Sequence, residues 1–426
     1  MARKIKDSGI EWIGEIPEGW EVLAHKYIMH KEKSICEHYS GEDVISLTLN
    51  GVVKRDLENP SGKMPTTFDG YQFVDPNDLL LCLFDIDVTP RCVGLVKDYG
   101  VTSPAYSRFK IHSGFCNAYY NYLLRFIDDE KVFVHLSKNL RSSLTESDFG
   151  AIKTIVPPKA EQQRIADYLD NRTFEIDTLL SEARSSIEEY KKLKQAVIMQ
   201  AVTKGVRGER EMKDSGVEWT GLVPHHWGVA KIGSIGQTSS GATPLRSKEA
   251  SFFDDATIRW VRTLDLNDGL VYDSSEKITE LALASSACSI MPKGTVCVAM
   301  YGGAGTIGKC GLLMSDCATN QAVCSIVCNR EIVSPIFLLM QLLALKSYWM
   351  KYAVGTRKDP NISQDVVARM KILIPPLDEQ KEITDYLDAK CAEIDKLITK
   401  KEQLVKELES YKKSLIYEVV TGKREV

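Results

Sequence analysis

The sequence predicts an α+β (mixed α/β) protein with two globular domains, separated by two long helices that pair as an antiparallel coiled coil. Two internal repeats support this prediction. KDSGIEWIGEIPEGW at residues 6–20 recurs 207 positions later as KDSGVEWTGLVPHHW, and nine of the fifteen positions are identical. PPKAEQQRIADYLDNRTFEID at 157–177 recurs 218 positions later, at 375–395. Because the two offsets nearly agree, the chain consists of two similar halves joined head to tail, whereas the residues between the repeats have diverged.

The repeats divide the chain into four parts. Residues 1–156 form a first domain with its leading segment, 157–205 a first long helix, 206–374 a second domain with its leading segment, and 375–426 a second long helix. We call the repeat at residues 6–20 and 213–227 the leading segment. Its first copy precedes the first domain, and its second copy follows the first long helix. The second helix should therefore end beside the start of the chain, which gives the repeats a circular order and the molecule a pseudo-twofold arrangement.

Each long helix is expected to begin at a double proline and to end at a glycine. Proline keeps the preceding residue extended and is tolerated in the first helical turn. Apolar residues then recur in steps of three and four, which is the pattern of a coiled-coil seam. The phase is the same in both helices, which favours their pairing over two helices packed separately on their own domains. The predicted helix-pairing residues are Ile176, Leu179, Tyr190, Leu193 and Val197, with Ile394, Leu397, Leu404, Leu408, Tyr411 and Leu415.

The residues between the repeats predict mixed α/β domains. Short apolar runs of β character, such as DLLLCLF at 78–84 and TVCVAMYG at 295–302, alternate with turn-forming residues. A helical run, FLLMQLLALKSYWMKY, follows at 337–352. Neither domain contains a recognisable catalytic constellation, so no catalytic residue is predicted.

Composition limits the class of protein. No segment approaches the ~18 consecutive apolar residues of a membrane span, and we expect a cytoplasmic protein. The eleven cysteines include no C-x-x-C pair, which favours buried, reduced thiols over metal ligands. A net charge of −4 argues against a wholly basic nucleic-acid wrapper, although local basic faces remain compatible with it.

GAGTIGKC at 303–310 nearly matches the phosphate-binding loop G-x-x-x-x-G-K-[ST]. Cys310 stands where the motif needs a hydroxyl for Mg²⁺. The following residues also predict no helix, whose N-terminus would hold the phosphate. A glycine-rich hairpin is the better interpretation. The prolines of each pair follow Val156 and Ile374 rather than the Asn or Asp that an amino-methylating active site needs.

Polar residues in predicted turns are the candidates for DNA contact. Arginine and lysine can bond guanine edges, asparagine can bond adenine, and hydroxyl groups can bond phosphates. For any single residue a solvated surface role is the alternative. The candidates are Asn50, Lys54, Arg55, Arg91, Ser103, Tyr106 and Arg108 in the first domain, and Thr243, Arg246, Lys248, Arg262, Thr263, Arg357, Lys358 and Asn361 in the second.

These repeats resemble the specificity subunit of type I restriction-modification enzymes. The resemblance covers the full chain and rests on the duplicated DSG-EW-G-P-W and PP--EQ--I--YLD motifs, with SPAY at Ser103, TIG at Thr306 and TNQ at Thr319. It implies that each domain recognises one half of a bipartite site in double-stranded DNA. It also implies that the helices set the spacer and dock two DNA methylation subunits, and that two restriction subunits with translocase and nuclease activity join the larger assembly.

The same resemblance implies that this chain carries no cofactor of its own. S-adenosylmethionine, ATP and Mg are expected on the partner subunits. A recognition subunit of a Type IIB-like enzyme shares this architecture and stays open as an alternative. A nucleotide-dependent enzyme using the Gly303 loop is a weaker one, and a pure coiled-coil scaffold would not explain why the domains diverge while the helices stay alike.

Overall fold

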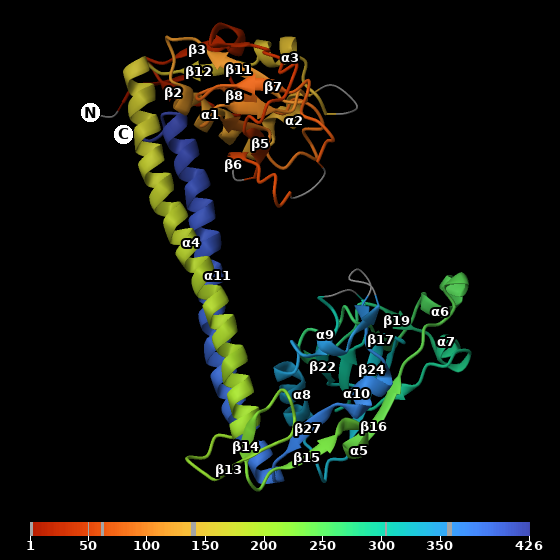
Figure 1. Cartoon of the computed structure of the whole chain (residues 1–426). Coiled ribbons are helices and arrows are strands. Elements are labelled where there is room, and N and C mark those ends of the chain that lie inside the picture. Colours follow the sequence, from red (N-terminus) through yellow and green to blue (C-terminus); the bar gives the residue numbers. More distant parts are fainter. Residues whose placement is uncertain (1–2, 50, 61–63, 138–141, 303–304, 356–359) are drawn as a thin grey trace. The chain divides into compact units, whose positions relative to one another are not determined.

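The computed structural model describes residues 3–49, 51–60, 64–137, 142–302, 305–355 and 360–426, and has the predicted mixed α/β character (Figure 1). The chain forms two compact units: residues 1–184 with 403–426, and residues 185–402. Both boundaries fall inside the long helices α4 (Lys159–Lys204) and α11 (Leu377–Val420). Each unit thus combines one globular domain with the first part of one helix and the last part of the other, which differs from the predicted division into separate domains and helices.

Each leading segment folds as a short antiparallel hairpin. In the first unit β1 (Ile5–Asp7) pairs with β2 (Glu15–Pro17), and in the second β13 (Met212–Asp214) pairs with β14 (Leu222–Pro224). The DSG motif forms the turn, because the aspartate Oδ1 accepts a hydrogen bond from the glycine N–H two residues later in both copies. Gly9 and Gly216 have φ angles of 65° and 62°, a conformation that favours glycine, so the repeat keeps glycine there.

The first domain contains a two-stranded ribbon and two four-stranded sheets. The ribbon pairs β3 (Glu21–Ala24) with β12 (Lys153–Val156). One sheet has the order β6 (Gly51–Lys54), β5 (Val44–Thr48), β10 (Gly100–Thr102), β7 (Gln72–Val74), and the other has the order β4 (Met29–Lys31), β11 (Ser107–Ile111), β8 (Leu79–Leu81), β9 (Val93–Leu95). The helices are η1 (His25–Tyr27), α1 (Asn117–Asp129), α2 (Val132–Leu136) and α3 (Glu146–Ala151).

The second domain repeats this plan with additional elements. Its ribbon pairs β15 (Gly228–Lys231) with β27 (Lys371–Ile374). The sheets have the orders β16 (Gly236–Ser240), β24 (Val323–Cys328), β21 (Val296–Ala299), β22 (Cys310–Leu313), β18 (Gly269–Val271), and β19 (Lys277–Ile278), β17 (Ile258–Val261), β23 (Cys317–Thr319), β20 (Ile290–Met291), with a small pair β25 (Val354–Gly355) and β26 (Pro360–Asn361). The helices are α5 (Ile232–Ile235), η2 (Arg246–Lys248), α6 (Glu249–Phe253), α7 (Glu280–Ala284), α8 (Pro335–Ala344), α9 (Trp349–Tyr352) and α10 (Gln364–Arg369).

The two long helices run antiparallel, as the circular order of the repeats predicts (Figure 1). In the first unit Ile176 and Leu180, from the first part of α4, share a core with Leu415 near the end of α11. In the second unit Ile198 of α4 shares a core with Ile383, near the start of α11. The predicted meeting of the second helix with the chain start is also confirmed. Lys423 Nζ donates to the Ile13 carbonyl oxygen at 2.6 Å.

The helix seam differs from the predicted one at alternate positions. Of the predicted residues, Ile176, Ile394 and Leu415 are buried, and Tyr190, Val197 and Leu408 are half-buried. The remaining five are exposed, and in each case the next residue along the chain is less exposed. Leu179, Leu193, Leu397, Leu404 and Tyr411 are replaced in the seam by Leu180, Lys194, Ile398, Val405 and Lys412. The prediction was wrong there because a seam residue can follow the previous one by three or by four positions. Leu179 and Leu180, for example, both fit this spacing after Ile176.

Two of the unexpected seam residues are lysines, and both bond an aspartate on the opposite helix. Lys412 Nζ lies 2.6 Å from Asp177 Oδ1 in the first unit. Lys194 Nζ lies 2.7 Å from Asp395 Oδ2 in the second. The members of the two pairs are equivalent under the 218-residue offset. A lysine stem can cover apolar surface while its ammonium group reaches the edge of the interface, which lets both lysines occupy the seam.

A glutamate, half-buried in the first unit and buried in the second, ties each leading segment to the start of a long helix. In the first unit Trp20 Nε1 donates to Glu161 Oε2 at 3.1 Å, and Arg3 Nη2 donates to Glu161 Oε1 at 2.5 Å. In the second unit Trp227 Nε1 and Arg210 Nη1 donate to Glu379 Oε2 at 3.2 and 2.8 Å. Trp20, Trp227 and Glu379 are almost fully buried. The recurrence of arginine, tryptophan and glutamate in both halves of the chain is therefore explained by one contact, which occurs in both units.

The glutamine that follows each glutamate joins the helix start to the domain. Gln162 Nε2 donates to the Pro157 carbonyl oxygen, and its Oε1 accepts from the N–H of Cys116, the residue that precedes α1. Gln380 makes the same two bonds, to the Pro375 carbonyl oxygen and from the N–H of Ser334, which precedes α8. A single side chain thus satisfies an otherwise unpaired amide at a helix N-terminus. The equivalent bonds identify α1 and α8 as counterparts.

Replacing Glu379 with glutamine should destabilise the second unit by about 1–3 kcal/mol, because the buried donors lose a charged acceptor. Burial raises the pKa of Glu379, but the hydrogen bonds from His226, Arg210 and Trp227 outweigh it and keep the pKa below the usual value. The stabilisation is present above the unfolded-state pKa of about 4.3 and is lost as the pH falls through the folded-state pKa.

Urea unfolding of wild type and E379Q at pH 7 and pH 3.5 measures this effect, with the exposed E175Q as the matched control. The difference between wild type and E379Q should shrink at the lower pH. A difference that is absent at pH 7, or that grows under acid conditions, contradicts the assigned role of Glu379.

Candidate nucleic-acid interface

Three predicted residues of the first domain surround one pocket. Lys54 ends β6, Arg55 follows it, and Tyr106 ends the turn before β11. Together they line a hollow of about 350 Å³. Lys54 Nζ forms an exposed ion pair with Asp43 Oδ1 at 2.6 Å. Gln72 Nε2 donates to the carbonyl oxygens of Ser103 and Tyr106, which holds the SPAY turn beside the pocket. The arrangement exposes polar groups on a rigid turn, as recognition of a nucleic acid requires.

Two other predicted arginines have internal roles. Arg108 is 2% exposed and bonds Asp78 through Nε and Asp75 through Nη2, both at 2.5 Å. Arg91 is 12% exposed and bonds Asp129 Oδ1 at 2.8 Å. Neither guanidinium group presents its donors to a DNA surface in this conformation. Sequence could not separate them from surface arginines, because their aspartate partners lie 30 or more residues away.

Two predicted arginines of the second domain converge on one carboxylate. Arg246 Nη2 lies 2.5 Å from Glu276 Oε2, and Arg262 Nη1 lies 2.6 Å from Glu276 Oε1. Arg246 also stacks over Phe253, with its guanidinium carbon 4.3 Å from the ring centroid, and both arginines approach Trp260. A hollow of about 470 Å³ adjoins Arg246, Phe253 and Glu276. The structure thus joins residues 16 positions apart into one half-exposed cluster of basic and aromatic groups.

Glu276, Phe253 and Trp260 were not predicted as members of the candidate interface. A lone glutamate gives no sequence signal, and an aromatic residue in an apolar run is usually part of a core. An aromatic ring beneath an arginine holds the guanidinium group in place, and a guanidinium group can bond bases or phosphates. The cluster is carried by η2, α6 and the loop before β19, and the described residues of the first domain form no helix between β4 and β5, where η2 and α6 would correspond.

The remaining predicted residues do not join either group. Thr243 and Asn361 are exposed, whereas Thr263 is buried. Lys248 lies in η2, but its side chain is not described. Asn50, Arg357 and Lys358 lie outside the described residues. Their predicted contact with DNA stays a prediction.

The loop that resembles a phosphate-binding motif leads into a strand. Residues 305–309 form a turn, and Cys310 is the first, fully buried residue of β22. Gly308 has a φ of 77° and lies against the Trp349 ring. No helix follows that could direct its N-terminus at a phosphate. Among the described residues there is also no group of three or more His, Cys, Asp or Glu side chains arranged to hold a metal ion.

Within the described part of the chain, no helix is long and apolar enough to cross a membrane. All eleven cysteines are unpaired thiols, and ten of them are buried, as the lack of paired spacings suggested.

Comparison with known proteins found one matching domain family and several similar proteins. The Type I restriction modification DNA specificity domain matches residues 224–407. The putative type I restriction enzyme MjaX specificity subunit of Methanocaldococcus jannaschii is 24% identical over 314 residues, covering 72% of this chain and 67% of that protein. The type I restriction enzyme MjaVIII specificity subunit of the same organism is 26% identical over 282 residues, covering 65% of this chain and 63% of that protein.

Solved structures extend the similarity of the fold to nearly the whole chain. A chain from a structure described as the basis of complex assembly and conformational transition of the type I R-M system has a TM-score of 0.73 at 14% identity, covering 96% of this chain and 99% of that one. The HsdS subunit from Thermoanaerobacter tengcongensis has a TM-score of 0.51 at 15% identity, covering 96% and 98%. At these identities the likeness establishes the fold.

The chain thus has two diverged α/β domains on duplicated helices, and residues 224–407 match a DNA specificity domain. The chain is similar to type I restriction-modification specificity subunits, through the family model over residues 224–407 and through relatives that are 24% and 26% identical. The resemblance noted in its repeats is thereby confirmed.

Replacing Arg108 with alanine should lower the thermal stability of the first unit without altering which DNA sequence is recognised. The change leaves Asp78, which is 2% exposed, without its charged partner, and breaking a buried ion pair costs about 3–5 kcal/mol. Calorimetry on the intact chain gives the melting temperature, and the surface variant K54A serves as the control. An unchanged melting temperature together with an altered methylation motif would show that Arg108 contacts bases instead.

Proposed function

We propose that this chain recognises a bipartite site in double-stranded DNA, with one domain for each half-site, and that it directs the methylation subunits of a type I restriction-modification enzyme. One observation carries the proposal. The leading segments and long helices make the same hydrogen bonds in both units, whereas the domains between them differ in their exposed polar clusters. Lys54, Arg55 and Tyr106 form the cluster of the first domain, and Arg246 and Arg262 form that of the second. Two similar scaffolds that carry different polar clusters suit the recognition of two different half-sites.

The long helices supply both the spacer and the docking surface for partners. Their exposed faces carry apolar side chains at equivalent positions: Leu179 and Leu397 are 50% and 37% exposed, and Leu193 and Tyr411 are 48% and 49% exposed. Exposed apolar residues at matching places in two repeats suit two copies of one partner. Those partners are the two DNA methylation subunits, joined by two restriction subunits in the larger assembly.

The chemistry resides on the partners in this proposal. The methylation subunits supply S-adenosylmethionine, and the restriction subunits supply ATP with Mg, while this chain acts in the cytoplasm without a catalytic centre. A nucleotide-dependent enzyme is not favoured, because a strand follows the Gly303 loop. A Type IIB-like recognition subunit is not favoured either, because the curated relatives reported above are type I specificity subunits.

The purified chain should transfer no methyl group to DNA alone and should direct transfer once methylation subunits are added. Sequencing of methylated bases in DNA treated with the chain, with the subunits, and with both together tests this expectation. Only the complete mixture should give a bipartite motif. Robust methylation by the chain by itself would overturn the proposed division of labour.

Lengthening the helices should change the spacer and leave both half-sites unchanged. Four residues add one turn, about 6 Å. Because the helices are paired, the insertion belongs in both of them, after Arg184 in α4 and after Glu402 in α11, where the two compact units divide. The methylation motif of the variant gives the result. An insertion in α4 alone serves as the comparison, since it breaks the seam, and an unaltered spacer in the paired variant would mean that the helices do not set the distance.

A further inference from the structure

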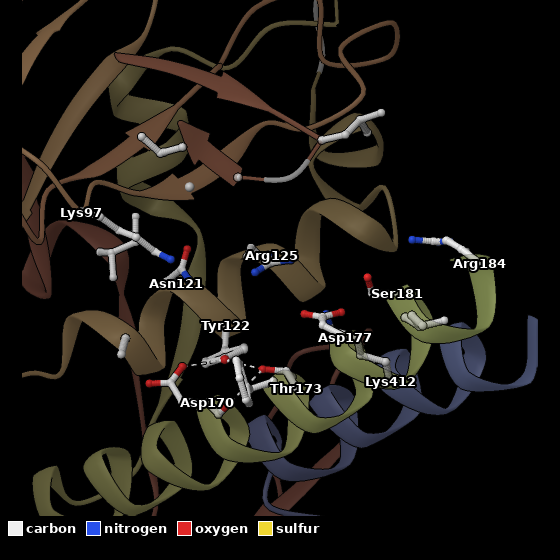
Figure 2. A pocket seen from close by; sticks show the side chains of 18 residues that line it. Lys97, Asn121, Tyr122, Arg125, Asp170, Thr173, Asp177, Ser181, Arg184 and Lys412 are labelled. Carbon is white, nitrogen blue, oxygen red and sulfur yellow. Dashed lines mark hydrogen bonds and ion pairs between the residues drawn. The ribbon is translucent and has the colours of Figure 1, made fainter. Parts of the chain in front are cut away.

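A cavity of about 820 Å³ opens in the first unit between the domain and its helices (Figure 2). Asn121 and Arg125 project into it from α1, and Asp177, Arg184 and Lys412 from α4 and α11. The end of β9 and the strand β6 complete its wall. None of the features predicted from sequence includes this cavity.

The four cations that line the cavity fall into two classes. Lys412 bonds Asp177 at 2.6 Å, and Arg184 bonds Glu409 at 2.6 Å, so both are neutralised within the protein. Among the described residues, neither Arg125 nor Lys97 has a hydrogen-bonded or ion-paired partner. Burial, with nearby Arg91 as a second cause, lowers the pKa of the Arg125 guanidinium. An anion in the cavity would remove this electrostatic cost.

A neutral polar group in the same cavity also lacks a partner. Asn121 Oδ1 is buried and accepts no hydrogen bond. Since the amide can be placed either way round, one of its two polar atoms is available to a ligand in both orientations. Asp170, the second carboxylate of the lining, already accepts from the Tyr122 hydroxyl at 2.7 Å. The lining side chains without a described partner are therefore the two cations, the amide and the Ser181 hydroxyl, which together suit an anion.

We infer that this cavity binds a phosphodiester group of the DNA backbone beside the first half-site, through Arg125 and Lys97. The inference rests on the proposed function. Gly51 and Val52 line the cavity, and Val53, Lys54 and Arg55 line the neighbouring pocket, so one strand borders both. A duplex whose bases meet Lys54 and Arg55 would bring its backbone to the cavity. Roughly half or more of protein–DNA hydrogen bonds go to the sugar–phosphate backbone, which fixes register rather than sequence.

Among the described residues, the second unit has no polar pair equivalent to Asn121 and Arg125. α1 and α8 are counterparts, and at the positions equivalent to Asn121 and Arg125 the second unit has Leu339 and Leu343. The duplicated scaffold therefore does not require a cation there. An acidic segment of a partner protein is the alternative ligand, but a contact needed by two copies of one partner would be expected in both units. Because the cations are present in one unit, a ligand that differs between the two units is favoured. DNA is such a ligand, since its two half-sites differ.

The test measures DNA binding by the complex with its methylation subunits over a range of KCl concentrations. R125L introduces the residue of the second unit, K97A removes the second cation, and K153A removes an exposed lysine of β12 as the control. R125L and K97A should each reduce the slope of log K against log [salt] by about 1, and the double variant by about 2, with the methylation motif unchanged. K153A should leave the slope as in wild type.

Unchanged slopes in R125L and K97A would overturn the inference. So would weaker assembly with the methylation subunits at an unchanged slope, which would assign the cavity to an acidic protein segment. These results are distinct from failure of the proposed function, in which the wild-type complex itself would give no bipartite motif. K97A keeps the test decisive if R125L folds poorly, because Lys97 is exposed.

Discussion

The hydrogen bond from a buried tryptophan to a glutamate of low exposure is the contact on which each unit depends. Glu161 and Glu379 stand two residues inside the long helices, yet they accept from Trp20 and Trp227 in the leading segments. A carboxylate removed from water must be fully hydrogen-bonded, and the arginine of each leading segment provides the second donor. The leading segment, the helix and the domain therefore have one compatible arrangement, which the chain uses twice.

This constraint explains why the supports have stayed alike while the domains have diverged. The ribbon strands, the α1 and α8 N-termini and the helix starts are bound together by Gln162 and Gln380 as well as by the glutamates. Loops that do not touch these groups are free to change. The second domain has gained η2, α6 and α7, and with them the cluster around Glu276. Diverged surface on a constant scaffold is the property that a protein with two recognition specificities requires.

Several arginines and lysines of the chain can be grouped by the place of the carboxylates that they bond. Arg108 and Arg91 are neutralised by aspartates inside the first domain, and Lys412 and Lys194 by aspartates across the helix seam. Arg246 and Arg262 both bond the carboxylate of Glu276. A net charge of −4 is thus compatible with several cations gathered at one place, because the average over the chain does not show their arrangement.

The sequence by itself determined the duplicated organisation, the antiparallel pairing and the absence of a helix after the Gly303 loop, because repeats, prolines and glycines act locally. The tertiary structure decided the seam register, since Leu179 and Leu180 fit the spacing equally well until packing buries one of them. It also decided which candidate arginines stay accessible. Partners such as Asp78 for Arg108, or Glu276 for Arg246, lie about 30 residues away, and only folding brings such charges within hydrogen-bonding distance.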